Sequence, residues 1–185
     1  MKHLKKIESQ ISIPPSVKIE KKKQFLMFSG VLGFTKLDLT KIDPKGLGGI
    51  KISEDGKTLN VYSQSKTFFY SLESLLKNKI RGVTVGFLTY LRIVGVGYRA
   101  SLEKTLDKEF YNFKLGYSHS LKYQVPSSIR AFLLEPTLLG IFGIDKNQVS
   151  QVGNKIRSFK VPERYKGKGI RFTTEKISLS PGKRK

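Results

Sequence analysis

The chain has 185 residues, 38% of them hydrophobic, and its 35 Lys and Arg against 14 Asp and Glu give a formal net charge of +21. This composition predicts a folded protein, and so large an excess of positive charge indicates a polyanion as partner. The absence of Cys and the presence of only two His exclude disulfides, thiol chemistry and an imidazole metal cluster, and no apolar run reaches the 18 residues of a membrane span. We expect no metal, no membrane partner and no cleaved targeting segment.

The first 82 residues predict a small α+β domain of strands followed by one helix. Its strands alternate apolar and polar residues, and Asp55-Gly56 supplies the positive φ that a tight hairpin needs. From Gln64 the apolar residues recur every three or four positions, as on one face of a helix, and Gly82 is the expected stop. The expected elements are an edge strand at 11–19 broken by two prolines, a charged turn at 21–23, a hairpin of strands at 24–32 and 34–39, a second hairpin of strands at 49–53 and 58–63, and a helix at 64–81.

Residues 83–185 predict a second domain with the same order of elements. Asp145 can cap a helix with Gln148 three residues on, and its apolar stripe ends before Pro162. The repeated order implies an α+β fold of two similar domains, 1–82 and 83–185, each an antiparallel sheet packed with one main helix. The expected elements are a long strand at 84–100 with bends at its glycines, a polar turn at 103–108, strands at 110–116, 121–125, 129–134 and 138–142, and the helix that begins at residue 145.

The positive charge is densest at the end of the chain, where residues 152–185 contain eleven Lys or Arg and two Glu. Within it, residues 161–172 alternate cations, glycines and an aromatic ring. Lysines offer point charges to phosphates, arginines offer a planar fork of donors, and a tyrosine offers a flat face to a base or ribose. Gly167 and Gly169 allow backbone N–H groups to approach a phosphate. The alternative is a solvated turn rich in Lys and Gly.

Two patterns that are typical of enzymes lack their context. Residues 95–100 match the G-x-G-x-x-A of a dinucleotide fold, but a turn and a strand follow them instead of a helix, and residues 115–120 contain no carboxylate. His119 lies between two serines, and adjacent residues of a strand point to opposite faces, so His119 cannot readily activate either one. We therefore predict no enzyme, no cofactor and no small-molecule substrate.

Six strings carry a resemblance to a known family: IRGVTVGF at 80–87, LRIVGVGYRA at 91–100, LGYSH at 115–119, IDK at 144–146, PERYKGKGIRF at 162–172 and PGK at 181–183. In order and spacing they resemble ribosomal protein six of the large subunit. The resemblance implies two similar α+β domains and a position on large-subunit rRNA near the factor-binding side and the sarcin-ricin loop. It also implies neighbouring ribosomal proteins as partners and translational GTPase factors nearby. The first domain matches the family less well, around residues 30–34 and 45–50.

The candidate RNA-binding residues come from these strings and from the basic end of the chain. They are Tyr98, Arg99, Tyr117, His119, Arg157, Tyr165, Lys166, Gly167, Lys168, Gly169, Arg171 and Lys183. Three of them have an alternative role, since Tyr98 and Tyr117 are equally consistent with packing on a sheet, and Arg157 with stabilising a helix C-terminus.

The sequence therefore predicts a structural constituent of the large ribosomal subunit that binds large-subunit rRNA. The alternatives are a structured-RNA-binding protein or RNA chaperone outside the ribosome, and an RNA-modifying enzyme, which would need a cofactor loop or converging acids and bases. The many Lys, Phe, Tyr, Ile and Asn residues point to an AT-rich genome. We expect a ribosome of the mitochondrial matrix, with the bacterial cytoplasm and the plastid as alternatives.

Overall fold

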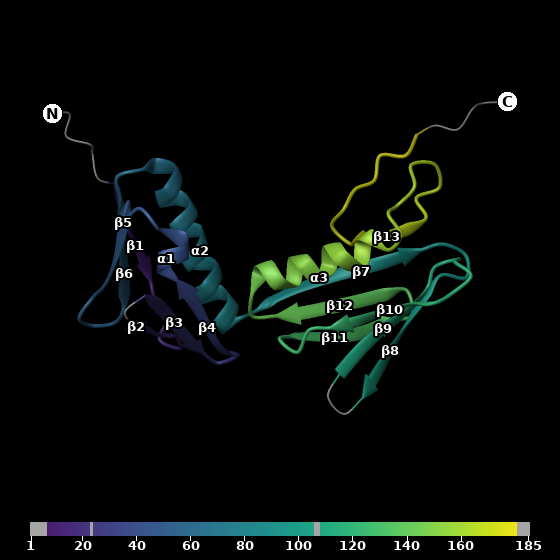
Figure 1. The fold of residues 1–185 in the computed structure, drawn as a ribbon, viewed down its shortest axis with the longest axis horizontal. Coiled ribbons are helices and arrows are strands. Elements are labelled where there is room, and N and C mark those ends of the chain that lie inside the picture. Colours follow the sequence, from purple (N-terminus) through teal and green to yellow (C-terminus); the bar gives the residue numbers. More distant parts are fainter. Residues whose placement is uncertain (1–6, 23, 106–107, 181–185) are drawn as a thin grey trace. The chain divides into compact units, whose positions relative to one another are not determined.

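The computed structural model describes residues 7–22, 24–105 and 108–180, and the chain divides into two compact units, Met1–Gly86 and Phe87–Lys185. The described residues form thirteen strands and three helices, and every strand pair is antiparallel, so the predicted α+β class is confirmed (Figure 1). The division follows Gly86 rather than residue 82 because the helix that ends the first unit is longer than predicted.

The first unit contains two small sheets and one long helix. Its elements are β1 Ile7–Ser12, β2 Lys18–Lys22, β3 Phe25–Gly30, β4 Gly33–Asp38, α1 Leu39–Ile42, β5 Gly48–Ile52, β6 Thr58–Ser63 and α2 Lys66–Thr84. One sheet has the order β1-β6-β5 and the other β2-β3-β4, and α2 packs against both. The helix buries Phe69, Leu72, Leu76 and Ile80, because spacing by three and four places them on one face.

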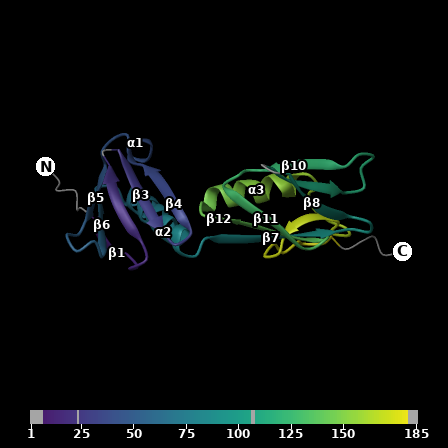
Figure 2. The ribbon, with the colours of Figure 1, turned by 90° about the horizontal axis from the view of Figure 1, so that it is seen from below.

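The second unit contains a three-stranded and a four-stranded sheet (Figure 2). Its elements are β7 Phe87–Val94, β8 Arg99–Thr105, β9 Lys108–Lys114, β10 Leu121–Val125, β11 Ile129–Glu135, β12 Leu138–Gly143, α3 Lys146–Ser158 and β13 Gly169–Phe172. The sheet orders are β10-β9-β8 and β11-β12-β7-β13, and α3 packs on β7, β12 and β13. Asp145 caps α3 by accepting a hydrogen bond from the N–H of Asn147 at 3.0 Å, so the predicted start of this helix is confirmed.

The two units repeat one plan. In each, the first strand pairs with the strand that precedes the main helix, β1 with β6 and β7 with β12. The next three strands form a separate sheet, β2-β3-β4 in one unit and β8-β9-β10 in the other. The prediction of a repeated element order is therefore confirmed, although each unit has two sheets rather than one. β13 has no counterpart among the described strands of the first unit.

The prediction that Gly82 ends its helix is wrong, because α2 continues to Thr84 with Gly82 buried. The chain leaves the helix at Gly86, which has φ 77° and whose N–H donates to the carbonyl oxygen of Arg81 at 3.0 Å. The turn between β3 and β4 packs on this end of the helix, where the N–H of Leu32 donates to the carbonyl oxygen of Val83 at 3.1 Å. The close approach here is made by Gly30 at the end of β3, where an added Cβ would lie 2.6 Å from the carbonyl oxygen of Val83.

The predicted strand at 84–100 is in fact two strands, β7 and β8, which lie in different sheets. Gly95 with φ 151° and Gly97 with φ 74° turn the chain between them. The predicted polar turn at 103–108 is also wrong, since residues 103–105 continue β8 and Lys108 begins β9. In the same way, Lys21 and Lys22 of the predicted charged turn lie in β2, because charged side chains on a strand can face solvent. Residues 23, 106 and 107 lie outside the described residues.

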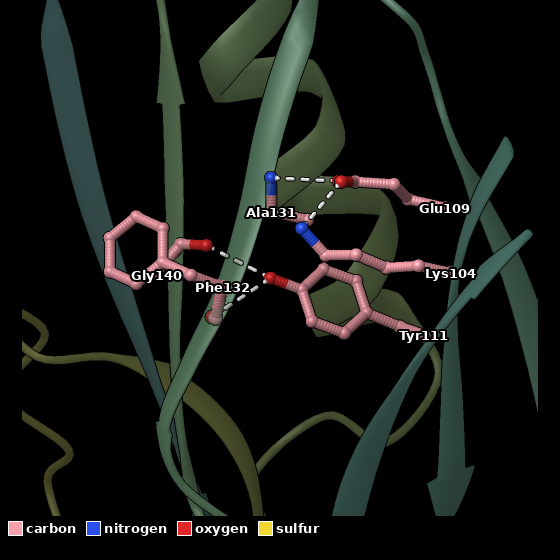
Figure 3. Close-up of polar contacts among 6 residues, drawn as sticks. All are labelled: Lys104, Glu109, Tyr111, Ala131, Phe132 and Gly140. Atoms are coloured by element: carbon pink, nitrogen blue, oxygen red, sulfur yellow. Dashed lines mark hydrogen bonds and ion pairs between the residues drawn. The ribbon is translucent and has the colours of Figure 1, made fainter. Parts of the chain in front are cut away.

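A buried tyrosine joins the two sheets of the second unit. Tyr111 on β9 is fully buried, and its hydroxyl, which donates, lies 3.1 Å from the carbonyl oxygen of Phe132 and 2.9 Å from that of Gly140 (Figure 3). Burial raises the pKa of this hydroxyl, so it remains a donor. Beside it, the carboxylate of Glu109 accepts from the N–H of Ala131 at 3.3 Å. Polar contacts thus fix the sheets within an apolar core.

We expect residues 87–185 to fold without the first unit, because this unit has its own core built from both sheets and α3. The fragment should unfold in one cooperative transition in urea, followed by circular dichroism. A shorter fragment, 87–168, lacks β13 and should be less stable by about 2 kcal/mol or more, since it loses the burial of Ile170 and a row of strand hydrogen bonds. A broad, noncooperative transition for 87–185 would contradict this independence.

Candidate nucleic-acid interface

Three segments of the second unit meet next to β13: the turn from β7 to β8, the turn from β9 to β10, and the segment from α3 to β13. The ring of Tyr98 in the first turn lies against Gly116 in the second. The hydroxyl of Tyr117 donates to the carbonyl oxygen of Phe159 at 3.1 Å, and Lys160 Nζ lies 4.4 Å from the centroid of the Tyr117 ring. The candidate residues 98, 99, 117, 119 and 165–171 therefore belong to one region.

Residues 159–168, here called the basic segment, form a closed structure rather than an open loop. The N–H of Glu163 donates to the carbonyl oxygen of Lys168 at 3.0 Å, and the N–H of Gly167 donates back to that of Glu163 at 3.1 Å. The N–H of Ile170 donates to the carbonyl oxygen of Lys160 at 2.7 Å. The segment is thus closed on itself and held against β13.

The strand that follows the basic segment was not predicted. Residues 169–172 form β13, which pairs with β7 and places Ile170 opposite Ile93. Ile170 has no exposed surface, and Phe172 lies against Gly153 of α3. The only sequence signal for this strand is the alternation of Ile170 and Phe172 with Arg171, which is too short to separate from a basic loop.

The two glycines of the segment serve its fold. Gly167 and Gly169 are buried, and the N–H of Gly167 donates to the carbonyl oxygen of Glu163 within the segment. Their predicted approach to a phosphate stays a prediction. Gly169 has φ 143°, and a Cβ at this position would lie 2.7 Å from the carbonyl oxygen of Lys160 and from the nitrogen of Pro162. Any side chain at residue 169 therefore strains the backbone and collides with the start of the segment.

An ion pair fastens the chain after β13 to α3. Arg157, in the last turn of α3, donates from Nε and Nη2 to the carboxylate of Glu175 at 2.9 and 2.5 Å. The same carboxylate accepts from the N–H of Phe172 at 3.3 Å. These hydrogen bonds from Arg157 lower the pKa of Glu175 and raise that of Arg157. The Nε and Nη2 donors of Arg157 are thus bound to Glu175 within the protein. The predicted contact of Arg157 with RNA stays a prediction.

The tail beyond Glu175 returns to the basic segment. The N–H of Ser180 donates to the carbonyl oxygen of Arg164 at 2.9 Å. The side chain of Leu179 reaches the site of Gly167, where an added Cβ would lie 3.5 Å from its Cδ2. The segment is therefore held by β13 on one side and by the tail on the other.

The polar side chains of this framework differ in how far they reach solvent. Tyr165 is 72% exposed and Lys166 is exposed beside it, whereas Lys168 and Arg171 are half-buried. Arg99 is exposed at the start of β8. The exposed cations Arg164 on the segment and Arg92, which pairs with Arg171 across the strands, were not predicted, although both lie inside strings of the resemblance.

The aromatic candidates divide into packing and surface residues. Tyr98 is half-buried, and its ring covers Gly95 and Gly116, so its packing role is the one that the structure displays. Tyr117 is 44% exposed and stacks with the exposed ring of His119, with centroids 6.4 Å apart and planes at 25°. Lys183 lies outside the described residues.

The described residues contain no group of three or more His, Cys, Asp or Glu side chains placed to hold a metal ion. Within the same residues, no helix has the length and apolar character needed to cross a membrane. The chemistry available at the interface is therefore that of exposed cations, aromatic rings and hydrogen-bonding groups, which suits the phosphates, riboses and bases of RNA.

Comparison with known proteins agrees with this chemistry. Residues 94–173 match the family model described as ribosomal protein L6. The chain is 39% identical over 194 aligned positions to the large ribosomal subunit protein uL6m of Prototheca wickerhamii, with all of both chains covered. It is 34% identical to uL6 of Mycoplasmoides gallisepticum, with 94% of this chain and 92% of the relative covered. It is 35% identical to uL6 of Paramagnetospirillum magneticum, with 95% and 96% covered.

The repeated α+β units, the basic interface and these matches define a structural ribosomal protein rather than an enzyme. The chain belongs to the ribosomal protein L6 family. The family predicted from the sequence strings is thereby confirmed.

Gly169→Ala should destabilise the second unit by about 3 kcal/mol or more, because it combines backbone strain with a collision against backbone atoms. Gly97→Ala is the matched control, since Gly97 also has positive φ, 74°, but open space around its Cβ position, and we expect it to cost about 1 kcal/mol. Urea unfolding of the full chain measures both values. Equal losses for the two variants would show that the close approach at residue 169 is unimportant.

Glu175→Gln should destabilise the fold by about 1–2 kcal/mol at neutral pH, because it removes the charge that Arg157 binds. The folded state lowers the pKa of Glu175, so its contribution is fully present above the ordinary value of 4.5 and disappears as the pH falls through the lower folded value. Unfolding free energies at several pH values should therefore differ between parent and variant at pH 7 and converge in acid. Glu20→Gln, at an exposed pair with Lys22, is the control and should have little effect. A difference independent of pH would contradict the proposed ion-pair contribution.

Proposed function

We propose that the chain is a structural component of the large ribosomal subunit and binds large-subunit rRNA through the basic segment and its neighbours in the second unit. The observation that carries the proposal is the closed, fastened basic segment, which presents Tyr165 and Lys166 to solvent. Membership of the ribosomal protein L6 family and the net charge of +21 support it.

The proposed contacts divide by chemistry. Phosphates are bound by Arg99, Lys166, Lys168 and Arg171, with Lys183 of the terminal string added from the sequence. Tyr165 and His119 offer rings to a base or ribose, since both are exposed. Tyr117 supports the platform, because its ring stacks with His119 while its hydroxyl is bound to Phe159.

The remaining candidates act by positioning. Arg157 holds Glu175, Gly167 and Gly169 permit the closed backbone, and Tyr98 packs between two glycines. A segment fixed before binding loses little conformational freedom when RNA arrives, so more of the interaction energy appears as affinity. Folded RNA is recognised largely by its shape, phosphates and 2′-hydroxyls, and a rigid array of cations suits such a target.

The resemblance and the relatives support a proposal for the place of binding within the subunit and for the compartment. We infer that the chain binds near the sarcin-ricin loop and the factor-binding side, next to other ribosomal proteins and within reach of translational GTPase factors. We infer a mitochondrial ribosome, supported by the full-length match to a uL6m protein at 39% identity. Bacterial uL6 proteins at 31–36% identity make the bacterial cytoplasm the main alternative, followed by the plastid.

RNA binding over a salt series tests this function with the full chain and a transcript of the large-subunit rRNA. Lys166→Ala should weaken binding and reduce the slope of log affinity against log salt by about one unit, because it removes one phosphate contact. Lys51→Ala, which removes an exposed lysine of the first unit, is the matched control and should leave affinity nearly unchanged.

Glu175→Gln separates a shaped site from a charged surface. The substitution raises the net charge, so a site made of charge alone predicts tighter RNA binding. A shaped site predicts weaker binding with little change in the slope of log affinity against log salt, because the contacts of Glu175 with Arg157 and with the N–H of Phe172 are weakened. Tighter binding of this variant would show that the basic segment binds RNA through its charge and not through its shape. Sedimentation of the chain apart from large subunits at moderate salt would favour an RNA chaperone outside the ribosome.

A further inference from the structure

The four-stranded sheet of the second unit has a second face that the core does not use. Leu91, Ala131 and Ile141 point into the core, so the residues that alternate with them on β7, β11 and β12 point to the opposite side. We call this side the outer face. It lies on the same sheet as β13 but on the side away from Ile170.

The centre of the outer face is apolar. In register across the strands, Phe132 lies opposite Gly140, which lies opposite Tyr90, and Phe142 lies opposite Leu88 in the next row. The ring of Phe132 covers Gly140 and meets the ring of Tyr90 edge to face at 6.2 Å. Leu88 is 48% exposed.

An antiparallel sheet with one face in solvent normally carries polar side chains there. None of the four apolar side chains Leu88, Tyr90, Phe132 and Phe142 is part of the core of the second unit. A contiguous apolar surface of this kind marks an interaction site, because its exposure to water is unfavourable.

Three arginines surround this centre. Arg130 lies opposite Phe142, and Arg92 lies opposite Arg171 on neighbouring strands. Like charges directly across a strand pair destabilise a sheet. A partner that brings negative charge to Arg92 and Arg171 would therefore offset the repulsion between these two side chains. In residues 7–22, 24–105 and 108–180, none of the three guanidinium groups takes part in a salt bridge, although Arg171 lies near enough to Glu175 to contribute to the lowered pKa of that carboxyl.

The choice of cation indicates the kind of partner. The chain has 27 Lys and eight Arg, yet the cations around the apolar centre of the outer face are arginines. Protein interfaces combine aromatic residues with Arg and are depleted in Lys, whereas phosphate-binding surfaces use both Lys and Arg and do not require an apolar centre. The basic segment, with its Lys-Gly-Lys string, is typical of a phosphate-binding surface, and the outer face is typical of a protein interface.

We propose that the outer face binds a neighbouring protein of the large subunit, whose apolar side chains cover Tyr90, Phe132 and Phe142 and whose carboxylates pair with Arg92 and Arg130. The proposal rests on the proposed function in one respect, that the chain resides in the large subunit. Arg171 lies between the two surfaces, because its strand follows the basic segment and also forms an edge of the outer face.

Site-specific photo-crosslinking in assembled large subunits tests the proposal. The full chain carries p-benzoylphenylalanine in place of Leu88, and a second preparation carries it in place of Tyr165, both of which are exposed. We expect the probe at residue 88 to attach to a peptide of another ribosomal protein that contains apolar residues and Asp or Glu, identified by mass spectrometry. The probe at residue 165 should attach to rRNA.

Attachment of the residue 88 probe to rRNA, to its own chain only, or to nothing would overturn the protein-docking proposal. Failure of the residue 165 probe to reach rRNA would instead count against the proposed function, so the two failures are distinguishable.

Arg130→Glu provides a second measurement on the same face. Arg130 and Leu88 share a row across Phe142, so charge reversal should reduce the protein crosslink of the residue 88 probe at least several-fold. Arg130→Lys, which keeps the charge, is the matched control. Circular dichroism confirms folding of each variant, and an undiminished crosslink with Arg130→Glu would contradict a role for charge.

Discussion

The pairing of β13 with β7 is the constraint on which the interface depends. It buries Ile170 completely within an otherwise strongly basic stretch, and burial of one such side chain contributes about 1.5–3 kcal/mol. That single apolar anchor sets the end of the basic segment, and the hydrogen bond from Ile170 to Lys160 sets its beginning. The cations can therefore be held in a fixed array although their mutual repulsion opposes it.

The repeat explains why the two units differ in role. Both contain the same two sheets and helix, but the second extends its larger sheet by β13 and adds the segment and tail that surround it. Two surfaces result in the second unit, the lysine-rich basic segment and the arginine-rimmed outer face, and Arg171 of β13 lies between them.

Local sequence patterns predicted much of the fold, but they could not predict contacts between residues that are far apart in the sequence. The hairpins β3-β4 and β5-β6 and the helix capped by Asp145 follow from alternation, turn chemistry and helical spacing. Gly82 was misassigned because a glycine packed inside a helix looks the same in sequence as one that ends it. The sequence shows neither the ion pair of Arg157 with Glu175 nor the close backbone packing at Gly169, because both partners come from other parts of the fold, and the predicted RNA contacts of these residues stay predictions.

The order of strands in the second unit has a consequence for biosynthesis. β7 is the first strand of the unit to be made, and it pairs with β13, which is the last. The sheet therefore stays incomplete until almost the whole polypeptide has left the ribosome that makes it, and a chain that stops before residue 169 lacks the strand that organises its basic segment.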